Sequence, residues 1–301
     1  MKNKHTKNKH NHKQEGLSDE LLRILKMIWS VFFPLAAYYL ISSMAMMILT
    51  LVVQDMAAVI SKDGIGWSAD NENAIQAVSN GIGMLIAAFC LRRPFLSEVV
   101  LQGEPVTIKP RRLFGSLIHE DGKRFRSQWK GMAAGAVLAV CASLSLNLFA
   151  ELIRAVQYSR LYEETVQIQY AVSFAVGLLL YGVISPIAEE MLFRGILYGR
   201  CRRYLGVLPG ILLSSILFAI LHGNLVQGIY AFLMGMLICG IYERYHSFFA
   251  SVIFHASANV TAFSLSYFTV RTTTSCMVIN CVIFAIISSA FVLFIFFRKK
   301  N

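Results

Sequence analysis

Charged residues are scarce in this sequence. Asp, Glu, Lys and Arg together make up 15% of its 301 residues, whereas an ordinary soluble domain carries about 25%. Hydrophobic residues account for 56%, and apolar runs of roughly 20 residues, long enough to cross a bilayer, recur along the chain. The composition therefore excludes an ordinary soluble domain and predicts an all-α, polytopic integral membrane protein.

Acidic residues are fewer than basic ones, with 17 Asp and Glu against 28 Lys and Arg and a net charge of +11. A strong basic excess can indicate nucleic-acid binding. Here, however, the Lys and Arg residues cluster between the apolar runs, as the positive-inside rule expects of cytoplasmic loops. We therefore expect membrane lipid, and no nucleic acid, as a partner.

Several motifs that would define other classes are missing. The six cysteines form no Cys-x-x-Cys pair, and most lie in apolar runs, so they are interpreted as small buried hydrophobic residues. No His-Glu-x-x-His motif is present, and we find no internal repeat of the kind that many transporters contain. These absences argue against a disulfide framework and against a repeat-built transporter.

The apolar runs predict about eight transmembrane helices. Their approximate positions are 28–53, 75–91, 131–150, 168–200, 207–222, 225–242, 247–266 and 277–297. Residues 1–27 form a basic tail whose first 16 residues have nothing to bury, so we expect a solvated segment without fixed structure. With this tail and the basic loop 92–130 in the cytoplasm, every basic cluster falls on one side and both termini are cytoplasmic.

The stretch from Ser185 to Gly195 contains two adjacent carboxylates and an arginine in an otherwise apolar helix. A charged residue at the centre of a membrane helix costs on the order of 3 kcal/mol, so such residues usually have a function. Glu190 and Arg194 stand four residues apart and can pair on one helix face. Glu189 has no such local partner, which makes it the candidate for chemistry.

Three further polar residues lie in later spans. His222 follows Phe218 by one helical turn, and Asn259 follows His255 by one turn on the same face. An antiparallel hairpin that turns near residue 206 would bring His222 to the height of Glu189, since both lie about 25 Å from that turn. The sequence thus permits these groups to meet inside the membrane.

Two chemistries are open to such a cluster. Glu189 and His222 can take a proton from water, while His255 and Asn259 donate hydrogen bonds to a developing oxyanion. Alternatively, Glu189, His222 and His255 can hold a divalent metal such as zinc that activates the water. A metal-independent mechanism remains open beside it.

Each residue also has a plainer interpretation. A single membrane histidine often hydrogen-bonds across a helix interface, Glu190 and Arg194 form a structural pair that can orient Glu189, and Phe218 serves packing. A non-catalytic protein for bacteriocin immunity, transport or regulation could use the same buried polar cluster for binding or proton relay. The combination of residues favours catalysis over these alternatives.

In order along the chain, three motifs stand on predicted membrane helices: Glu-Glu-x-x-x-Arg (Glu189, Glu190, Arg194), Phe-x-x-x-His (Phe218, His222) and His-x-x-x-Asn (His255, Asn259). This series resembles the CPBP family of intramembrane proteases, which includes the type II CAAX prenyl endopeptidases and the bacterial bacteriocin-processing or self-immunity proteins of the Abi group. The resemblance covers about residues 165–266.

The resemblance implies an intramembrane endopeptidase, of a group usually labelled metalloproteases, that cleaves a hydrophobic, lipidated or leader-bearing peptide or protein. By position it makes Glu189 and His222 the residues that activate water, and His255 and Asn259 the oxyanion donors. The chain then divides into the tail 1–27, N-terminal membrane helices 28–164, a catalytic core 165–266 and a last helix with a basic end, 267–301. We expect a bacterial plasma membrane and a cavity that opens to the cytoplasm.

Overall fold

The computed structural model describes residues 2–60, 63–100, 110–155, 159–268 and 273–297. In these ranges every regular element is a helix, and the chain is an all-α polytopic membrane protein. Among the described residues seven helices are long and apolar enough to cross a membrane. The predicted span at 207–222 corresponds to a shorter apolar helix, Val207–Ile220. The cytoplasmic location of the termini stays a prediction.

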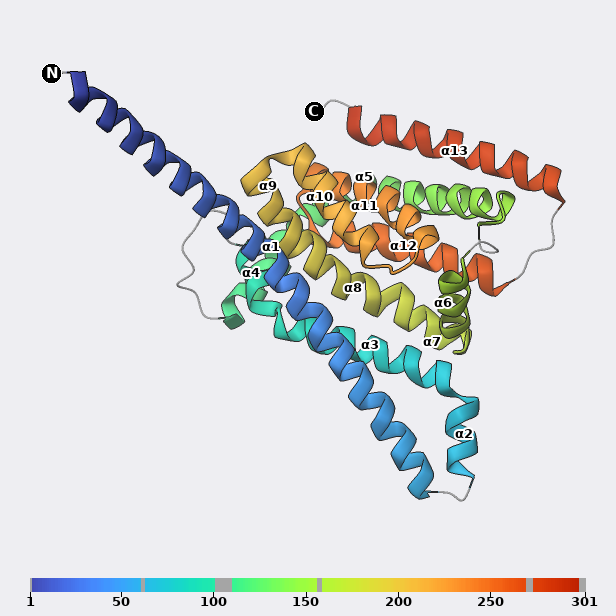
Figure 1. The fold of residues 1–301 in the computed structure, drawn as a ribbon. Helices are drawn as coiled ribbons and strands as arrows, with labels where there is room; N and C mark the ends of the chain where they lie inside the picture. The colour runs from blue at the N-terminus through green and yellow to red at the C-terminus, as the bar shows by residue number, and fades with distance from the viewer. Residues whose placement is uncertain (1, 61–62, 101–109, 156–158, 269–272, 298–301) are drawn as a thin grey trace.

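The first half of the chain forms five helices: α1 (Lys2–Ile60), α2 (Gly64–Asp70), α3 (Glu72–Cys90), α4 (Arg92–Val100) and α5 (Pro110–Leu152). Helix α1 includes the N-terminal tail, so the expectation of a segment without fixed structure is wrong for the described part of that tail. Extending an existing helix adds one hydrogen bond per residue and needs no new nucleus. In Figure 1 this end of α1 projects away from the other helices.

The predicted basic loop 92–130 is helical wherever the structure describes its backbone, and residues 101–109 lie outside the described ranges. Helix α4 buries Phe95 and Leu96 in the core. Its Glu98 forms ion pairs with Arg203 and, at 2.9 Å, with Arg200. Helix α4 is thus packed in the core and holds the end of the central helix in place. The basic charge of this segment alone did not predict this packing.

The central helix runs without interruption over Phe174–Leu205. Its segments are α7 (Phe174–Leu179), the π-helical η2 (Leu180–Ile184), α8 (Ser185–Glu190), the π-helical η3 (Met191–Tyr198) and α9 (Gly199–Leu205), and a separate helix, α6 (Arg160–Tyr170), precedes it. The two glutamates therefore lie on a short α-helical segment between two wider π-helical turns. Such turns are rare and frequently occur at functional sites.

Four helices complete the bundle: α10 (Val207–Ile220), α11 (Leu225–Tyr245), α12 (Phe248–Tyr267) and α13 (Thr274–Phe297). The predicted turn near Gly206 is confirmed. Gly206 has φ +90°, in the region that favours glycine, and it separates α9 from α10. Figure 1 shows α13 at the edge of the bundle beside α5, and α6 at the opposite end from α9.

The segment α8–η3 lies at the centre of the core. Leu192, Phe193, Ile196 and Leu197 are buried against apolar residues of α1, α3, α4 and α10. A second apolar cluster joins α5, α11 and α12. Within this segment two charged residues, Glu190 and Arg194, are fully buried.

Candidate active site

Glu190 and Arg194 form a fully buried ion pair, and both side chains have 0% exposure. Arg194 Nη1 donates to Glu190 Oε1 at 2.9 Å, which confirms the predicted pairing. The same Glu190 oxygen lies 2.7 Å from His255 Nδ1 on α12. A carboxylate oxygen accepts, so Nδ1 carries the hydrogen. Glu190 therefore orients His255, whereas the sequence suggested that it orients Glu189.

Arg194 has two further contacts that hold it in place. Its Nη2 donates to the carbonyl oxygen of Gly235 on α11 at 3.1 Å, and its guanidinium carbon lies 4.8 Å from the centre of the Phe218 ring. Phe218 also meets His222 and His255 edge-on, with ring centroids 4.8 and 5.8 Å apart. The predicted packing residue thus contacts both histidines and the arginine.

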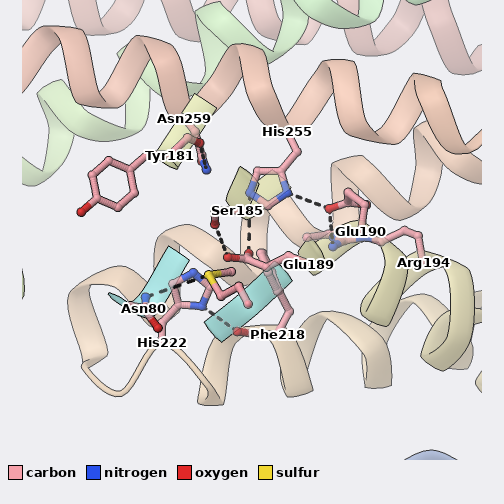
Figure 2. Close-up of polar contacts among 12 residues, drawn as sticks. Asn80, Tyr181, Ser185, Glu189, Glu190, Arg194, Phe218, His222, His255 and Asn259 are labelled. Carbon is pink, nitrogen blue, oxygen red and sulfur yellow. Dashed lines mark hydrogen bonds and ion pairs between the residues drawn. The ribbon is translucent and has the colours of Figure 1, made fainter. Parts of the chain in front are cut away.

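Glu189, the next residue on the same helix, faces a different environment. Its side chain is 17% exposed, and its Oε2 lies 3.8 Å from His255 Nε2. Ser185, one turn earlier, donates a hydrogen bond to Glu189 Oε1. Figure 2 shows His255 between the two glutamates, with Arg194 beyond Glu190. The 3.8 Å separation exceeds a direct hydrogen bond, so Glu189 keeps an oxygen available for another partner.

His222 lies directly after the end of α10 and is half-buried. Its Nδ1 is 2.7 Å from the Phe218 carbonyl oxygen. Because a carbonyl oxygen only accepts, Nδ1 donates and the lone pair of the neutral ring is on Nε2. The contact to Phe218 therefore leaves Nε2 able to accept a hydrogen bond or a proton.

Asn259 fills a gap in the backbone hydrogen bonding of the central helix. In the π-helical turn η2, the Ser185 amide donates to the Leu180 carbonyl, five residues back. The matching donor for the Tyr181 carbonyl would be residue 186, which is proline and has no N–H. Asn259 Nδ2 donates to that Tyr181 oxygen at 3.1 Å instead. Its second hydrogen and its carbonyl oxygen remain for other contacts.

A cavity of about 660 Å³ brings the four predicted catalytic residues together: its wall includes Glu189, His222, His255 and Asn259. They come from three separate parts of the chain, on α8, after α10 and on α12. Ser185 and Tyr181 also line it. Of the supporting residues, Glu190 and Arg194 are buried behind this wall. The predicted set therefore divides into cavity residues and buried residues that position them.

The prediction that the cavity opens to the cytoplasm conflicts with its lining. The cavity reaches Ile153 at the end of α5 and Ser159 and Tyr162 at the start of α6. These residues belong to the segment 151–167, which follows a span on the side opposite the basic clusters. The prediction of cytoplasmic basic clusters and the prediction of a cytoplasmic opening therefore cannot both hold, and the side to which the cavity opens stays a prediction.

The three predicted metal ligands do not form a metal site as they are placed. Among the described residues, no group of three His, Cys, Asp or Glu side chains lies close enough to hold an ion. Both histidine Nδ1 atoms are engaged, in His222 by the Phe218 carbonyl and in His255 by Glu190. This leaves both Nε2 atoms and Glu189 Oε2 as donor atoms of the kind that zinc binds. As placed, however, the three side chains are not close enough together to hold one ion, and the mechanism proposed below uses no metal.

Two residues of the site were missed in the sequence. Ser185 stands four residues before Glu189, a spacing that places both on one helix face, so its contact could have been predicted. Pro186, which leaves the Tyr181 carbonyl without a backbone donor, is the second. Its effect depends on the π-helical turn before it, for which a period of 3.6 residues gives no signal.

Residues 171–261 match the family model described as type II CAAX prenyl endopeptidase Rce1-like. The chain contains an Rce1-like segment. This segment begins just before α7, ends in α12 and includes all seven residues of the three motifs, so the resemblance to the CPBP family is confirmed over it. The family description supports a membrane protease at the level of the family.

One curated relative also matches. UPF0177 protein YxdF of Lactococcus lactis subsp. lactis (strain IL1403) is 30% identical over 82 residues, which are 27% of this chain and 45% of the relative. The chain therefore matches less than half the length of that relative. No solved structure matches the chain. Substrate and reaction details consequently depend on the geometry of the Rce1-like segment.

Proposed function

We propose that this protein is an intramembrane endopeptidase that hydrolyses a peptide bond in a hydrophobic peptide segment, in a bacterial plasma membrane. One observation carries the proposal. Three segments of the chain, on α8, just after α10 and on α12, bring a carboxylate, two imidazoles and a carboxamide to the wall of one cavity. The match to Rce1-like endopeptidases supports the same conclusion.

In this mechanism Glu189 is the general base. It accepts a proton from a water molecule, and the water oxygen forms a bond to the carbonyl carbon of the peptide. Ser185 holds one carboxylate oxygen, which leaves the other for the water. His222 accepts a hydrogen bond from the same water through Nε2 and orients it. Glu189 then returns the proton to the leaving nitrogen as the C–N bond breaks.

His255 and Asn259 stabilise the negative charge on the carbonyl oxygen during this addition. Asn259 uses the Nδ2 hydrogen that does not bind Tyr181, and His255 donates from Nε2 when its ring is doubly protonated. Glu190 fixes the His255 ring through Nδ1. Loss of one such donor typically lowers the rate by about 10²–10³. The second hydrogen of the water stays on the new acid, so the products are a carboxylic acid and an amine, which ionise to a carboxylate and an ammonium group.

Cleavage by purified protein tests this proposal. Internally quenched peptides with apolar centres are incubated with wild type, Glu189→Gln and His222→Ala in lipid vesicles, and the product termini are identified by mass spectrometry. Glu163→Gln, at an exposed position on α6, is the matched control. Cleavage by wild type and control with loss in both site variants supports the mechanism. Equal cleavage by all four proteins, or by none, would refute it.

A further inference from the structure

The two ends of the bundle differ in charge. Near the junction of α3 and α4, on the first part of α5 and on α9 lie Arg92, Arg93, Arg126, Lys130, Arg200, Arg202 and Arg203. The other end has the acidic residues Asp55, Asp63, Asp70, Glu72, Glu151, Glu163 and Glu164, with Arg154 and Arg160. We call these the basic end and the acidic end. By the positive-inside rule the basic end is cytoplasmic.

The cavity extends from the site toward the acidic end. Its wall takes six residues between Leu146 and Ala155, at and just after the end of α5, several from α6, and six between Leu225 and Leu233 at the start of α11. In the part of the chain that the structure describes, no residue of α4 or α9 lines it. Figure 1 places α6 at the far end of the bundle from α9. The basic end is thus closed to the cavity by the packed core around η3.

The rim of the cavity is apolar and faces outward. Phe149 and Ile153 on or just after α5 are each 53% exposed, and Leu225 and Ile229 on α11 are 76% and 56% exposed, although all four line the cavity. In a membrane helix, such side chains contact lipid. The cavity therefore opens between the end of α5 and the start of α11. This opening faces the lipid as well as the aqueous phase.

The inner wall is polar but almost uncharged. Apart from the two site histidines, its polar groups are amides and hydroxyls, such as Asn147, Gln169, Tyr162 and Tyr230. Glu189 is the one carboxylate among the described lining residues, and they include no lysine or arginine. Amides and hydroxyls can hydrogen-bond to a peptide backbone. An ionised substrate side chain would lose its hydration here without gaining a partner.

We propose that the substrate is an uncharged, apolar stretch of a membrane-inserted peptide, which enters between α5 and α11 from the half of the bilayer at the acidic, extracytoplasmic end. The inference rests on the proposed peptidase function and adds the route and the chemistry of the cleaved segment. It contrasts with a cytoplasmic C-terminal tail as substrate, because such a tail would have to approach through the basic end.

Thiol blocking tests the route. In a background with the exposed Cys90 and Cys276 replaced by serine, Ala155→Cys places a thiol in the cavity wall, and Arg126→Cys places one at the basic end. Spheroplasts and opened membranes are treated with a bulky membrane-impermeant maleimide. We expect labelling of Ala155→Cys in both and of Arg126→Cys only in opened membranes. Labelling at position 155 should lower cleavage at least tenfold and labelling at position 126 less than twofold.

The probe is a pair of internally quenched peptides with the same apolar flanks, one with leucine and one with lysine at the centre. The leucine peptide should be cleaved at least tenfold faster, and it should slow maleimide labelling of Ala155→Cys but not of Arg126→Cys. Labelling of Arg126→Cys from outside, a block at position 126 only, or equal cleavage of both peptides would overturn the inference. Protection at position 155 without cleavage would uphold the route and count against the peptidase itself.

Discussion

Two neighbouring carboxylates on α8 have opposite surroundings. Glu190 is 0% exposed and is held by Arg194 and His255 in the closed side of the helix. Glu189 is partly exposed to the cavity, with Ser185 as its hydrogen-bond donor and His255 at 3.8 Å. Successive residues on an α-helix point about 100° apart, which is sufficient to direct one carboxylate into the core and the other into the cavity.

The difference shows how one helix can separate positioning from chemistry. A carboxylate buried without water is tolerated only when it is paired, and removal of a partner leaves an uncompensated charge. Glu190 therefore contributes structure and the orientation of His255. Glu189 keeps an oxygen for water because His255 Nε2, its ion-pair partner among the described residues, lies 3.8 Å away, beyond hydrogen-bond distance. Substitutions on the two sides should consequently differ in whether they change rate or stability.

Loss of the cavity carboxylate should have the largest effect. Glu189→Gln keeps the size and a hydrogen-bond acceptor for Ser185 but removes the base, so we expect kcat/KM to fall by about 10²–10⁴. The free energy of unfolding should change by no more than about 1 kcal/mol, because the side chain is not buried with a charged partner. Peptide cleavage and denaturant unfolding measure the two quantities. A Glu189→Gln variant with a lowered free energy of unfolding but an unchanged kcat/KM would show that Glu189 has a structural role and is not the base.

Substitutions in the buried Glu190–Arg194 pair should mainly lower the free energy of unfolding. Arg194→Ala leaves the Glu190 carboxylate buried without its cation, which we expect to cost about 3–5 kcal/mol in unfolding free energy. The matched control is Glu190→Gln with Arg194→Met, which removes both charges and keeps the volume. It should be more stable than Arg194→Ala by at least about 2 kcal/mol, since neither partner is left ionised. An equal loss of unfolding free energy in both variants would show that an unpaired buried charge is not the cause of the destabilisation.

Asn259 contributes both to structure, by its hydrogen bond to the Tyr181 carbonyl, and to the proposed chemistry, as an oxyanion donor. A pair of substitutions can separate these two roles. Asn259→Ala leaves the Tyr181 carbonyl without its donor, at a cost of about 1–3 kcal/mol. Adding Pro186→Ala supplies an N–H at the position from which a π-helical turn would satisfy that carbonyl. We expect the second change to restore stability but not kcat/KM, because the oxyanion donor is still absent. Recovery of both, or of neither, would contradict the dual role.

The sequence predicted the local part of this arrangement well. The spacing of Glu190 and Arg194 predicted their ion pair, and apolar length predicted the spans. The contact between Glu190 and His255 joins residues 65 positions apart, so it depends on how α8 and α12 pack and leaves no mark in the local pattern. The spacing separated Glu190, paired with Arg194, from Glu189, but it could not show that the first is fully buried and that the second lines a cavity.

Charge patterning predicts an orientation of the helices, which stays a prediction, and it misjudged the structure of the segment between two of the spans. The run from Arg92 through the following basic residues was interpreted as a loop, although Phe95 and Leu96 pack in the core and Glu98 binds two arginines of α9. The same reading placed the cavity opening at the basic end. Cavities arise where side chains of several helices fail to fill space, which a one-dimensional pattern does not encode.

The smallest expected effect is that of metal removal, which tests whether the cavity residues form a metal centre. A catalytic zinc site needs three protein ligands around one point, and among the described residues no three His, Cys, Asp or Glu side chains lie close enough together to hold an ion. We expect dialysis against a strong chelator to change kcat/KM by less than about twofold, with metal analysis of the active protein showing less than stoichiometric zinc. Loss of activity that returns only on adding zinc would mean that Glu189, His222 and His255 converge in the working enzyme. His222→Ala should then abolish zinc binding, whereas in the mechanism proposed here it lowers only the rate, because the ring orients a water and no ion.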